Sequence, residues 1–132
     1  MKQRQQDAQC PCGTGYTYGQ CCGPLHQQHT VATTAEQLMR SRYSAFALGL
    51  ADYLRLSWHS ATRPAEIDLD ARQRWTKLEI LDTSGSSLLE SAGTVRFRAT
   101  YRLGRETGCL VENSRFAREG GQWRYVDAVS SR

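Results

Sequence analysis

The sequence predicts an α+β fold in which helices come before a meandering antiparallel sheet. Apolar residues repeat at three-to-four spacing over residues 35–50 and alternate with polar residues over 95–103, while four of the five cysteines lie ahead of both patterns. Helices that are segregated from a run of antiparallel strands are typical of the α+β class. The 132 residues suit one globular domain with a small appendage.

The N-terminal appendage carries its four cysteines as two pairs. Cys10 and Cys12 are separated by one proline, and Cys21 and Cys22 follow after eight residues. Adjacent cysteines would point to opposite faces of a strand, so a turn or a helix start must bend both toward one point. Four converging thiolates satisfy a tetrahedral metal without a hydrophobic core, and they leave no open position for a catalytic water. We therefore predict one metal ion, zinc in preference to iron, because a compact all-thiolate site needs no redox role.

Two other uses of clustered cysteines are less well supported. A disulfide framework would suit a secreted protein, but residues 1–7 lack the apolar stretch of a signal peptide, so we expect a cytoplasmic protein with reduced thiols. Redox exchange usually uses a C-x-x-C pair beside a strand, which this segment lacks. His26 follows the cluster, and it either replaces one paired cysteine as a ligand, supports a ligand by a hydrogen bond, or faces solvent.

A helix is predicted to begin near residue 34. Thr33 with Glu36 and Thr34 with Gln37 both have the spacing of a capping box. The apolar residues that follow share one helical face: Ala35, Leu38, Met39, Tyr43, Phe46 and Leu50. We expect this face to pack against a sheet.

The rest of the chain predicts one short helix and then strands. The helix is expected over residues 51–58, and the clearest strand over 95–103. An earlier strand opens at residues 78–80, and two more are expected over 109–118 and 122–129, joined by a Gly-Gly turn. No stretch approaches the length of a membrane span.

Two features of these strands bear on function. Arg96, Arg98 and Arg102 share the polar face of the alternating strand, and without interleaved aromatic residues they are typical of a solvated sheet surface. Binding to RNA or the ribosome is therefore a lesser hypothesis. Cys109 lies far from the cluster in sequence, and we expect it to be a small buried apolar residue of its strand.

The cysteine segment resembles the SEC-C motif, a zinc module found at the C-terminus of the SecA translocation ATPase and in stand-alone bacterial proteins. The matching residues are Cys10-Pro11-Cys12-Gly13-Thr14-Gly15, then Tyr18, then Cys21-Cys22. The motif commonly has basic residues after its second glycine, whereas this chain has Tyr16-Thr17. That difference weakens the expectation of an anionic partner at this loop.

Nearly the whole chain is similar to the YchJ family. The residues that carry this resemblance are Cys22-Gly23-Pro24-Leu25-His26, then Leu38-Met39-Arg40-Ser41-Arg42-Tyr43-Ser44-Ala45-Phe46, then Tyr53-Leu54 and Trp58-His59. It implies a SEC-C segment over residues 1–26 and a nuclear transport factor 2-like domain, the cystatin-like cone, over 31–132. In such a cone, helices pack into the concave face of a curved antiparallel sheet.

Three functions are compatible with these resemblances. The SEC-C likeness implies a zinc-binding protein-interaction module, linked to SecA-like, ribosomal or protein-quality partners. Alternatively, the cone holds a small molecule or an active site, although enzyme activity is the less favoured reading. The candidate pocket residues surround His59: Arg42, Tyr43, Trp58, Trp75 and Asp127, the last also a possible ion-pair partner of Arg42 or Arg40. A metal or redox sensor is the third hypothesis.

Overall fold

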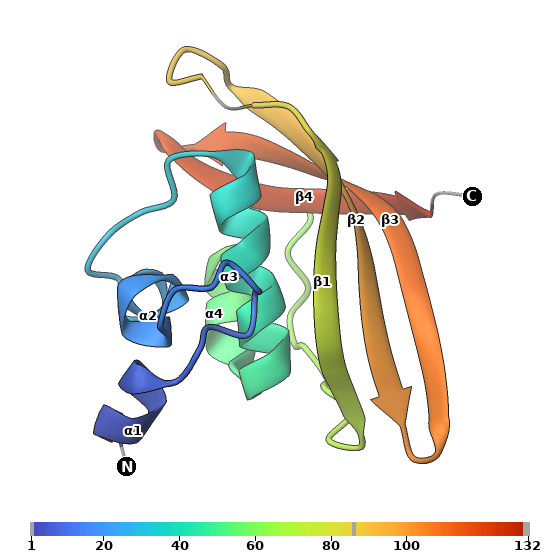
Figure 1. The fold of residues 1–132 in the computed structure, drawn as a ribbon. Helices are drawn as coiled ribbons and strands as arrows, with labels where there is room; N and C mark the ends of the chain where they lie inside the picture. The colour runs from blue at the N-terminus through green and yellow to red at the C-terminus, as the bar shows by residue number, and fades with distance from the viewer. Residues whose placement is uncertain (1, 86, 131–132) are drawn as a thin grey trace.

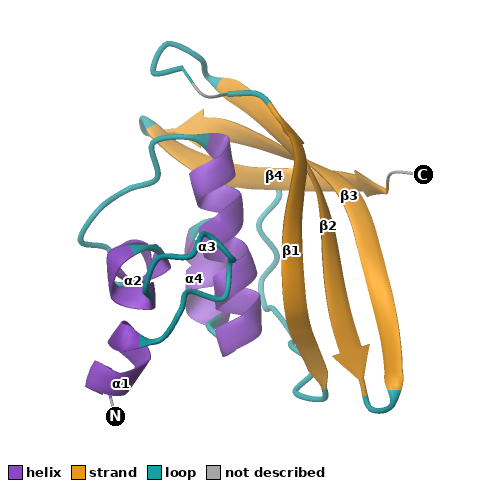
Figure 2. Cartoon of the chain, viewed as in Figure 1, coloured by secondary structure: helices purple, strands orange, loops and turns teal. Residues whose placement is uncertain are grey.

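The computed structural model describes residues 2–85 and 87–130, which form the α+β fold that the sequence predicts (Figures 1 and 2). Five short helical segments precede four strands. In chain order they are α1 (Lys2–Asp7), the 3-10 turn η1 (Tyr18–Gln20), α2 (Cys22–His26), α3 (Ala35–Leu48), α4 (Ala51–Leu56), β1 (Gln73–Thr83), β2 (Ala92–Leu103), β3 (Glu106–Glu119) and β4 (Gln122–Ser130).

The four strands form one antiparallel sheet in the order β1-β2-β3-β4. Pairing between β2 and β3 is continuous, whereas β1 shifts register twice along β2 and β4 shifts once at Arg115 and Phe116. Such irregularities bend a strand and increase its twist. The sheet accordingly curves, and its concave face holds α3 (Figure 1).

The helix α3 begins and ends as its sequence dictates. Of the two predicted capping boxes, the second supplies the cap, because the Thr34 hydroxyl accepts the backbone N–H of Gln37 at 3.0 Å. Glu36 pairs instead with Arg40, one turn later. Gly49 ends the helix in the left-handed conformation with φ of 74°, which glycine adopts without steric cost.

The core lies between α3 and the sheet. The predicted stripe is buried over its first part, and Phe46 and Leu50 are half-buried. The largest enclosed side chains on the sheet side are Val95, Phe116 and Trp123. The same core extends to the other side of α3, where it includes buried side chains of the cysteine segment: Cys10, Cys12, Tyr18, Cys22 and Leu25.

Figure 1 shows α3 between the N-terminal segment and the sheet. This central helix therefore touches both parts of the molecule, and α2 packs directly on it. In the part of the chain that the model describes, no helix has both the length and the apolar character needed to cross a membrane.

Candidate metal centre

The four N-terminal cysteines bring their sulfur atoms together at one point. All four sulfurs lie within 4.8 Å of one another. The Sγ atoms of Cys12 and Cys21 are 3.5 Å apart, and those of Cys21 and Cys22 are 4.0 Å apart. Zinc bound to four thiolates at 2.3 Å would place the sulfurs about 3.8 Å from one another. The cluster therefore fits a tetrahedral thiolate site.

Local backbone geometry explains how each pair converges. A turn follows Cys10, closed by the N–H of Gly13 donating to the Cys10 carbonyl at 3.2 Å, and Gly13 has a φ of 84°. The second pair straddles a helix start, because Cys21 is the N-cap of α2 and Cys22 is its first residue. The change of direction between these two residues brings both sulfurs to the same side. The sequence predicted this need for a turn or helix start.

Burial and contacts among the sulfurs shift the pKa values of Cys10, Cys21 and Cys22 in different directions. Cys10, Cys12 and Cys22 are buried, and Cys21 is half-buried. Hydrogen bonds from Cys12 and Cys22 lower the pKa of Cys10 well below the usual thiol value, and the hydrogen bond to Cys10 raises that of Cys22. Burial raises the pKa of Cys21 to about 11. Four thiolates can coexist in this volume only with a cation among them, as a bound metal would provide.

Two side chains of α3 form hydrogen bonds with the cysteine cluster. The Ser44 hydroxyl lies 3.3 Å from the sulfur of Cys22 and 3.5 Å from that of Cys10, and Ser44 is fully buried. One turn earlier, Arg40 donates from Nη1 to the carbonyl of Cys12 at 2.8 Å. On the open side, the Thr14 hydroxyl lies 3.2 Å from the Cys21 sulfur. Sequence reasoning did not assign these contacts: nothing in the spacing of α3 shows which of its faces meets the cysteines, and Thr14 was noted only as part of the motif.

His26 lies outside the four-sulfur group and bridges the segment to α3. Its Nε2 donates to the Ser41 carbonyl at 2.8 Å, because a carbonyl can only accept. Its Nδ1 is therefore the acceptor for the Tyr18 hydroxyl at 2.6 Å. Burial lowers the pKa of His26, which favours this neutral form. Both ring nitrogens are thus engaged within the protein, and the ring packs edge-on against Tyr53.

The cone holds a separate cavity between α3 and the sheet, with a volume of about 220 Å³. Four predicted pocket residues line it: Arg42, Tyr43, Trp58 and Trp75. Sequence reasoning missed the rest of the lining, which comes from the helix and the sheet together: Met39, Phe46, Phe97, Ala99, Leu110, Glu112, Ser114 and Tyr125. The inward positions of the strand pattern could have suggested Phe97 and Ala99.

Two predicted pocket residues do not line this cavity. His59 lies beside it, with its backbone N–H donating to the Tyr125 carbonyl and its Nδ1 accepting from the N–H of Ala61. Asp127 forms an ion pair with Arg115 on the neighbouring strand, so the proposed pairing with Arg42 or Arg40 is wrong. The two carboxylate oxygens face the two guanidinium nitrogens of Arg115, a geometry that strongly favours this partner.

The prediction for Cys109 is also wrong, because its side chain is exposed. Cys109 pairs with Thr100 across β2 and β3, and the next residue, Leu110, is the one that lines the cavity. Successive side chains of a strand point to opposite faces, so Cys109 faces outward. On β2, Arg98 and Arg102 are exposed, as predicted for a solvated surface, whereas Arg96 is half-buried, and Arg98 lies 3.5 Å from Glu79.

Comparison with known proteins agrees with both parts of this structure. Residues 34–128 match the family model of the middle, NTF2-like domain of YchJ. The chain belongs to the YchJ family. A UPF0225 protein of Streptomyces avermitilis is 54% identical over 124 residues, which cover 94% of this chain and 86% of that protein. A UPF0225 protein of Chromobacterium violaceum is 42% identical over 134 residues and covers 98% of each chain.

Two solved structures resemble the fold over almost its full length. A SEC-C motif-containing protein from Rhodopseudomonas palustris has a TM-score of 0.82 and 33% identity, covering 93% of this chain and 98% of that one. A SEC-C motif-containing protein from Psychrobacter arcticus has a TM-score of 0.79 and 25% identity, covering 98% of this chain and 86% of that one. This YchJ-family chain therefore combines an NTF2-like domain with a cysteine cluster compatible with metal binding.

Proposed function

We propose that this protein binds one zinc ion through Cys10, Cys12, Cys21 and Cys22, and that the loaded segment contacts a protein partner. The observation that carries the first part is the convergence of four sulfurs within 4.8 Å of one another. Soft thiolates select zinc or iron rather than magnesium or calcium. Zinc is preferred because the site is closed by four protein ligands, which suits a structural ion.

The supporting contacts favour a structural role for the ion. Ser44 and Arg40 hold the cluster against α3, so an ion at this point would fasten residues 8–26 to the central helix. Hydrogen bonds to sulfur stabilise the thiolate form that a metal requires. Structural zinc contributes on the order of 10 kcal/mol to the folding of small modules. The zinc would therefore fix the shape of the surface around it.

An exposed aromatic side chain beside the cluster marks the proposed contact surface. Tyr16 lies in the loop between the two cysteine pairs and is 63% exposed. It borders a groove that runs past Gln20 to Gln37 and Arg40 on α3. Tyrosine is enriched at protein interfaces because it offers a large, rigid contact area with a polar tip. The resemblance to the SecA module favours partners from translocation, the ribosome or protein quality control.

The metal is identified by elemental analysis of the purified full chain. We expect one zinc per chain in the wild type, and loss of that zinc when Cys21 and Cys22 are both changed to serine. Cys109→Ser is the matched control, because its thiol is exposed and lies outside the cluster. One iron per chain would replace zinc as the assigned metal, and a metal-free wild type would reject the site.

The partner is sought by affinity capture from bacterial cytoplasm, followed by mass spectrometry. Tyr16→Ser should abolish capture while keeping the zinc, and the Cys21→Ser, Cys22→Ser double variant should lose both. Leu88→Ser is the control, since Leu88 is 80% exposed but belongs to the loop between β1 and β2. Capture that survives both the Tyr16 change and metal loss would reject an interaction through this surface.

A further inference from the structure

The cavity in the cone contains a buried arginine, Arg42, that forms no ion pair with the part of the chain that the model describes. Arg42 is only 3% exposed, and none of the ion pairs among residues 2–85 and 87–130 involves it. Burial lowers the pKa of Arg42 to about 10, which leaves the guanidinium protonated at neutral pH. A buried charge is costly unless something pairs with it. The cavity beside Arg42 is the place where such a partner fits.

Part of the guanidinium is fixed by the protein, and part is left free for a ligand. Nη1 donates to the Leu54 carbonyl and to the Ser57 hydroxyl, each at 2.7 Å. A guanidinium has five N–H donors, and those on Nε and Nη2 have no acceptor within the described part of the chain. In the described part of the chain, the side-chain nitrogen and oxygen atoms that have neither solvent contact nor a hydrogen-bond partner are Arg118 Nη2 and Trp123 Nε1. Nε and Nη2 of Arg42 are not among them, so these two atoms keep some accessible surface. The Arg42 donors are therefore reachable from the cavity.

Aromatic rings hold the guanidinium in position. Its carbon lies 4.3 Å from the centre of the Tyr125 ring and 5.0 Å from that of Trp58, and the two rings pack edge to face. Cation–π contacts keep a desolvated guanidinium in place without consuming its N–H donors. The bonds from Nη1 fix its rotation. The donors are thus oriented before any ligand arrives, which lowers the entropy cost of binding.

The other residues that line the cavity indicate what kind of ligand body would fit it. They are mostly apolar and aromatic, with Phe46, Trp75 and Leu110 among them. A dry cavity of about 150 Å³ accepts a benzene-sized molecule, so about 220 Å³ suits a ring or short chain with one substituent. Glu112 also lines the cavity, and burial raises the pKa of this carboxyl. When ionised, Glu112 would repel a second carboxylate on the ligand, so a ligand with one carboxylate fits this cavity best.

We propose that the cone cavity binds a small monocarboxylate with an aromatic or aliphatic body, whose carboxylate pairs with Arg42 between Trp58 and Tyr125. This site is separate from the cysteine cluster and does not depend on the function proposed for it. The pairing replaces water on the free guanidinium donors, and the apolar body replaces water along Phe46, Trp75 and Leu110. Charge-assisted hydrogen bonds make the carboxylate, rather than the ring, the recognised group.

The test compares ligands that differ only in charge. Benzoate with benzamide, and hexanoate with hexanamide, are titrated into the purified full chain at constant ionic strength. Tryptophan fluorescence and backbone amide chemical shifts report binding. We expect each carboxylate to bind at least about tenfold more tightly than its amide. The shift changes should centre on Arg42, Trp58, Glu112 and Tyr125.

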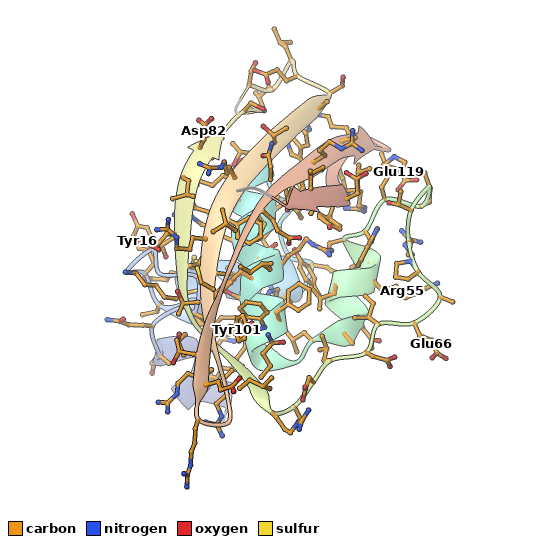
Figure 3. The ribbon with its side chains drawn as sticks, turned by 90° about the vertical axis from the view of Figure 1, so that its right-hand side faces the viewer. Tyr16, Arg55, Glu66, Asp82, Tyr101 and Glu119 are labelled. Carbon is orange, nitrogen blue, oxygen red and sulfur yellow. The ribbon has the colours of Figure 1, made fainter. Side chains whose placement is uncertain are left out.

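Variants separate the cavity from the general positive charge of the surface. Arg42→Met should reduce carboxylate affinity to that of the amide, whereas Arg55→Met should leave it unchanged. Arg55 is an exposed residue of α4, labelled at the edge of the molecule in Figure 3, so its loss removes the same charge outside the cavity. If Arg42→Met fails to fold, Ala99→Leu provides the second variant. It fills the cavity from β2, leaves Arg42 in place and should weaken both ligands.

Three results would overturn the proposal. The first is equal affinity of the carboxylate and its amide for the wild type. The second is a set of shift changes that follows exposed arginines such as Arg98 and Arg102. The third is the absence of binding by all four compounds up to roughly 10 mM, a concentration at which even a weak preformed site would be occupied.

Discussion

The cysteine segment and the cone are stabilised in different ways. Between residues 8 and 26 the buried side chains are small thiols together with Tyr18 and Leu25, which is too little apolar surface to hold an isolated fold. The cone encloses Val95, Phe116 and Trp123 under a helix. The comparison teaches that the cone has large apolar side chains of its own to pack, whereas the cysteine segment adds only a few buried side chains to the shared core and, on the proposed function, would gain most of its stability from a metal at its sulfurs.

The two parts meet on opposite faces of one helix. Arg40 and Ser44 of α3 point toward the cysteines, and Met39 and Tyr43 point toward the sheet and its cavity. The helix is held from the sheet side by packing, so it is a fixed support against which the cysteine segment can fold. We expect loss of the metal to affect the segment much more than the sheet.

Metal removal is the largest expected effect and tests this difference directly. A strong chelator should expose the backbone N–H groups of Cys10, Gly13 and Tyr18 to hydrogen exchange, because their acceptors lie within the cysteine segment. Structural zinc contributes on the order of 10 kcal/mol, so protection of these groups should be lost completely. Amides of β2 and β3 should stay protected. Exchange is followed residue by residue with and without the chelator.

Cys109→Ser gives the control for this experiment. It removes a thiol that is exposed on β3 and should exchange like the wild type in both conditions. Equal loss of protection in the sheet would show that the cone also depends on the metal. Unchanged protection in the segment would show that its few apolar side chains are sufficient.

The second prediction concerns the hydroxyl that links the two parts. Ser44→Ala removes the group that lies between the sulfurs of Cys10 and Cys22 while leaving all four cysteines. Loss of a polar group that supports metal ligands typically lowers metal affinity by about 10- to 100-fold. Competition with a chromophoric chelator measures this change for zinc.

Ser41→Ala is a matched control on the same helix. Ser41 is equally buried, but its hydroxyl donates to the Leu38 carbonyl and lies 2.7 Å from the Tyr53 hydroxyl. This change should lower the free energy of unfolding without altering zinc affinity. If both variants bind zinc equally well, Ser44 acts through packing alone.

Much of the fold could be predicted because its signals are local. The cap at Thr34, the stripe along α3 and the alternation in β2 each depend on neighbours within the same element. Cys109 was wrongly predicted to be buried because its exposure depends on how its strand pairs with the neighbouring strand and not on local sequence. A strand pattern gives the two faces, and only the register of β2 against β3 shows which face is outside.

The convergence of the four cysteines was easier to predict than the cavity for a related reason. All four cysteines lie within thirteen residues, so their spacing alone indicates convergence. The cavity is built from α3, all four strands and the segment around Trp58, which only the tertiary fold brings together. Sequence reasoning therefore found Arg42 and Trp58, but placed His59 and Asp127 beside them and missed Glu112 and Tyr125.

The third and smallest predicted effect is a pH dependence in the joint between the two parts. Burial lowers the pKa of His26 below its ordinary value of 6.5, and the neutral ring both donates to Ser41 and accepts from Tyr18. Below pH 6.5 the unfolded chain gains a proton that the folded chain still excludes. The contribution of His26 to stability should therefore be constant above pH 6.5 and fall as the pH drops toward the lowered pKa, by at most about 1.4 kcal/mol per pH unit.

Urea unfolding of the wild type and of His26→Gln over this pH range isolates the contribution. If the cluster holds a metal, protonation of its thiolates would also destabilise both proteins in acid, so the informative quantity is the difference in stability between them. The glutamine variant should be less stable at neutral pH, because its amide replaces the ring contacts imperfectly, and the gap should narrow as the pH falls below 6.5. If the difference in unfolding free energy between the two proteins does not change with pH, protonation of His26 makes no contribution, and the ring stabilises the joint through its packing alone.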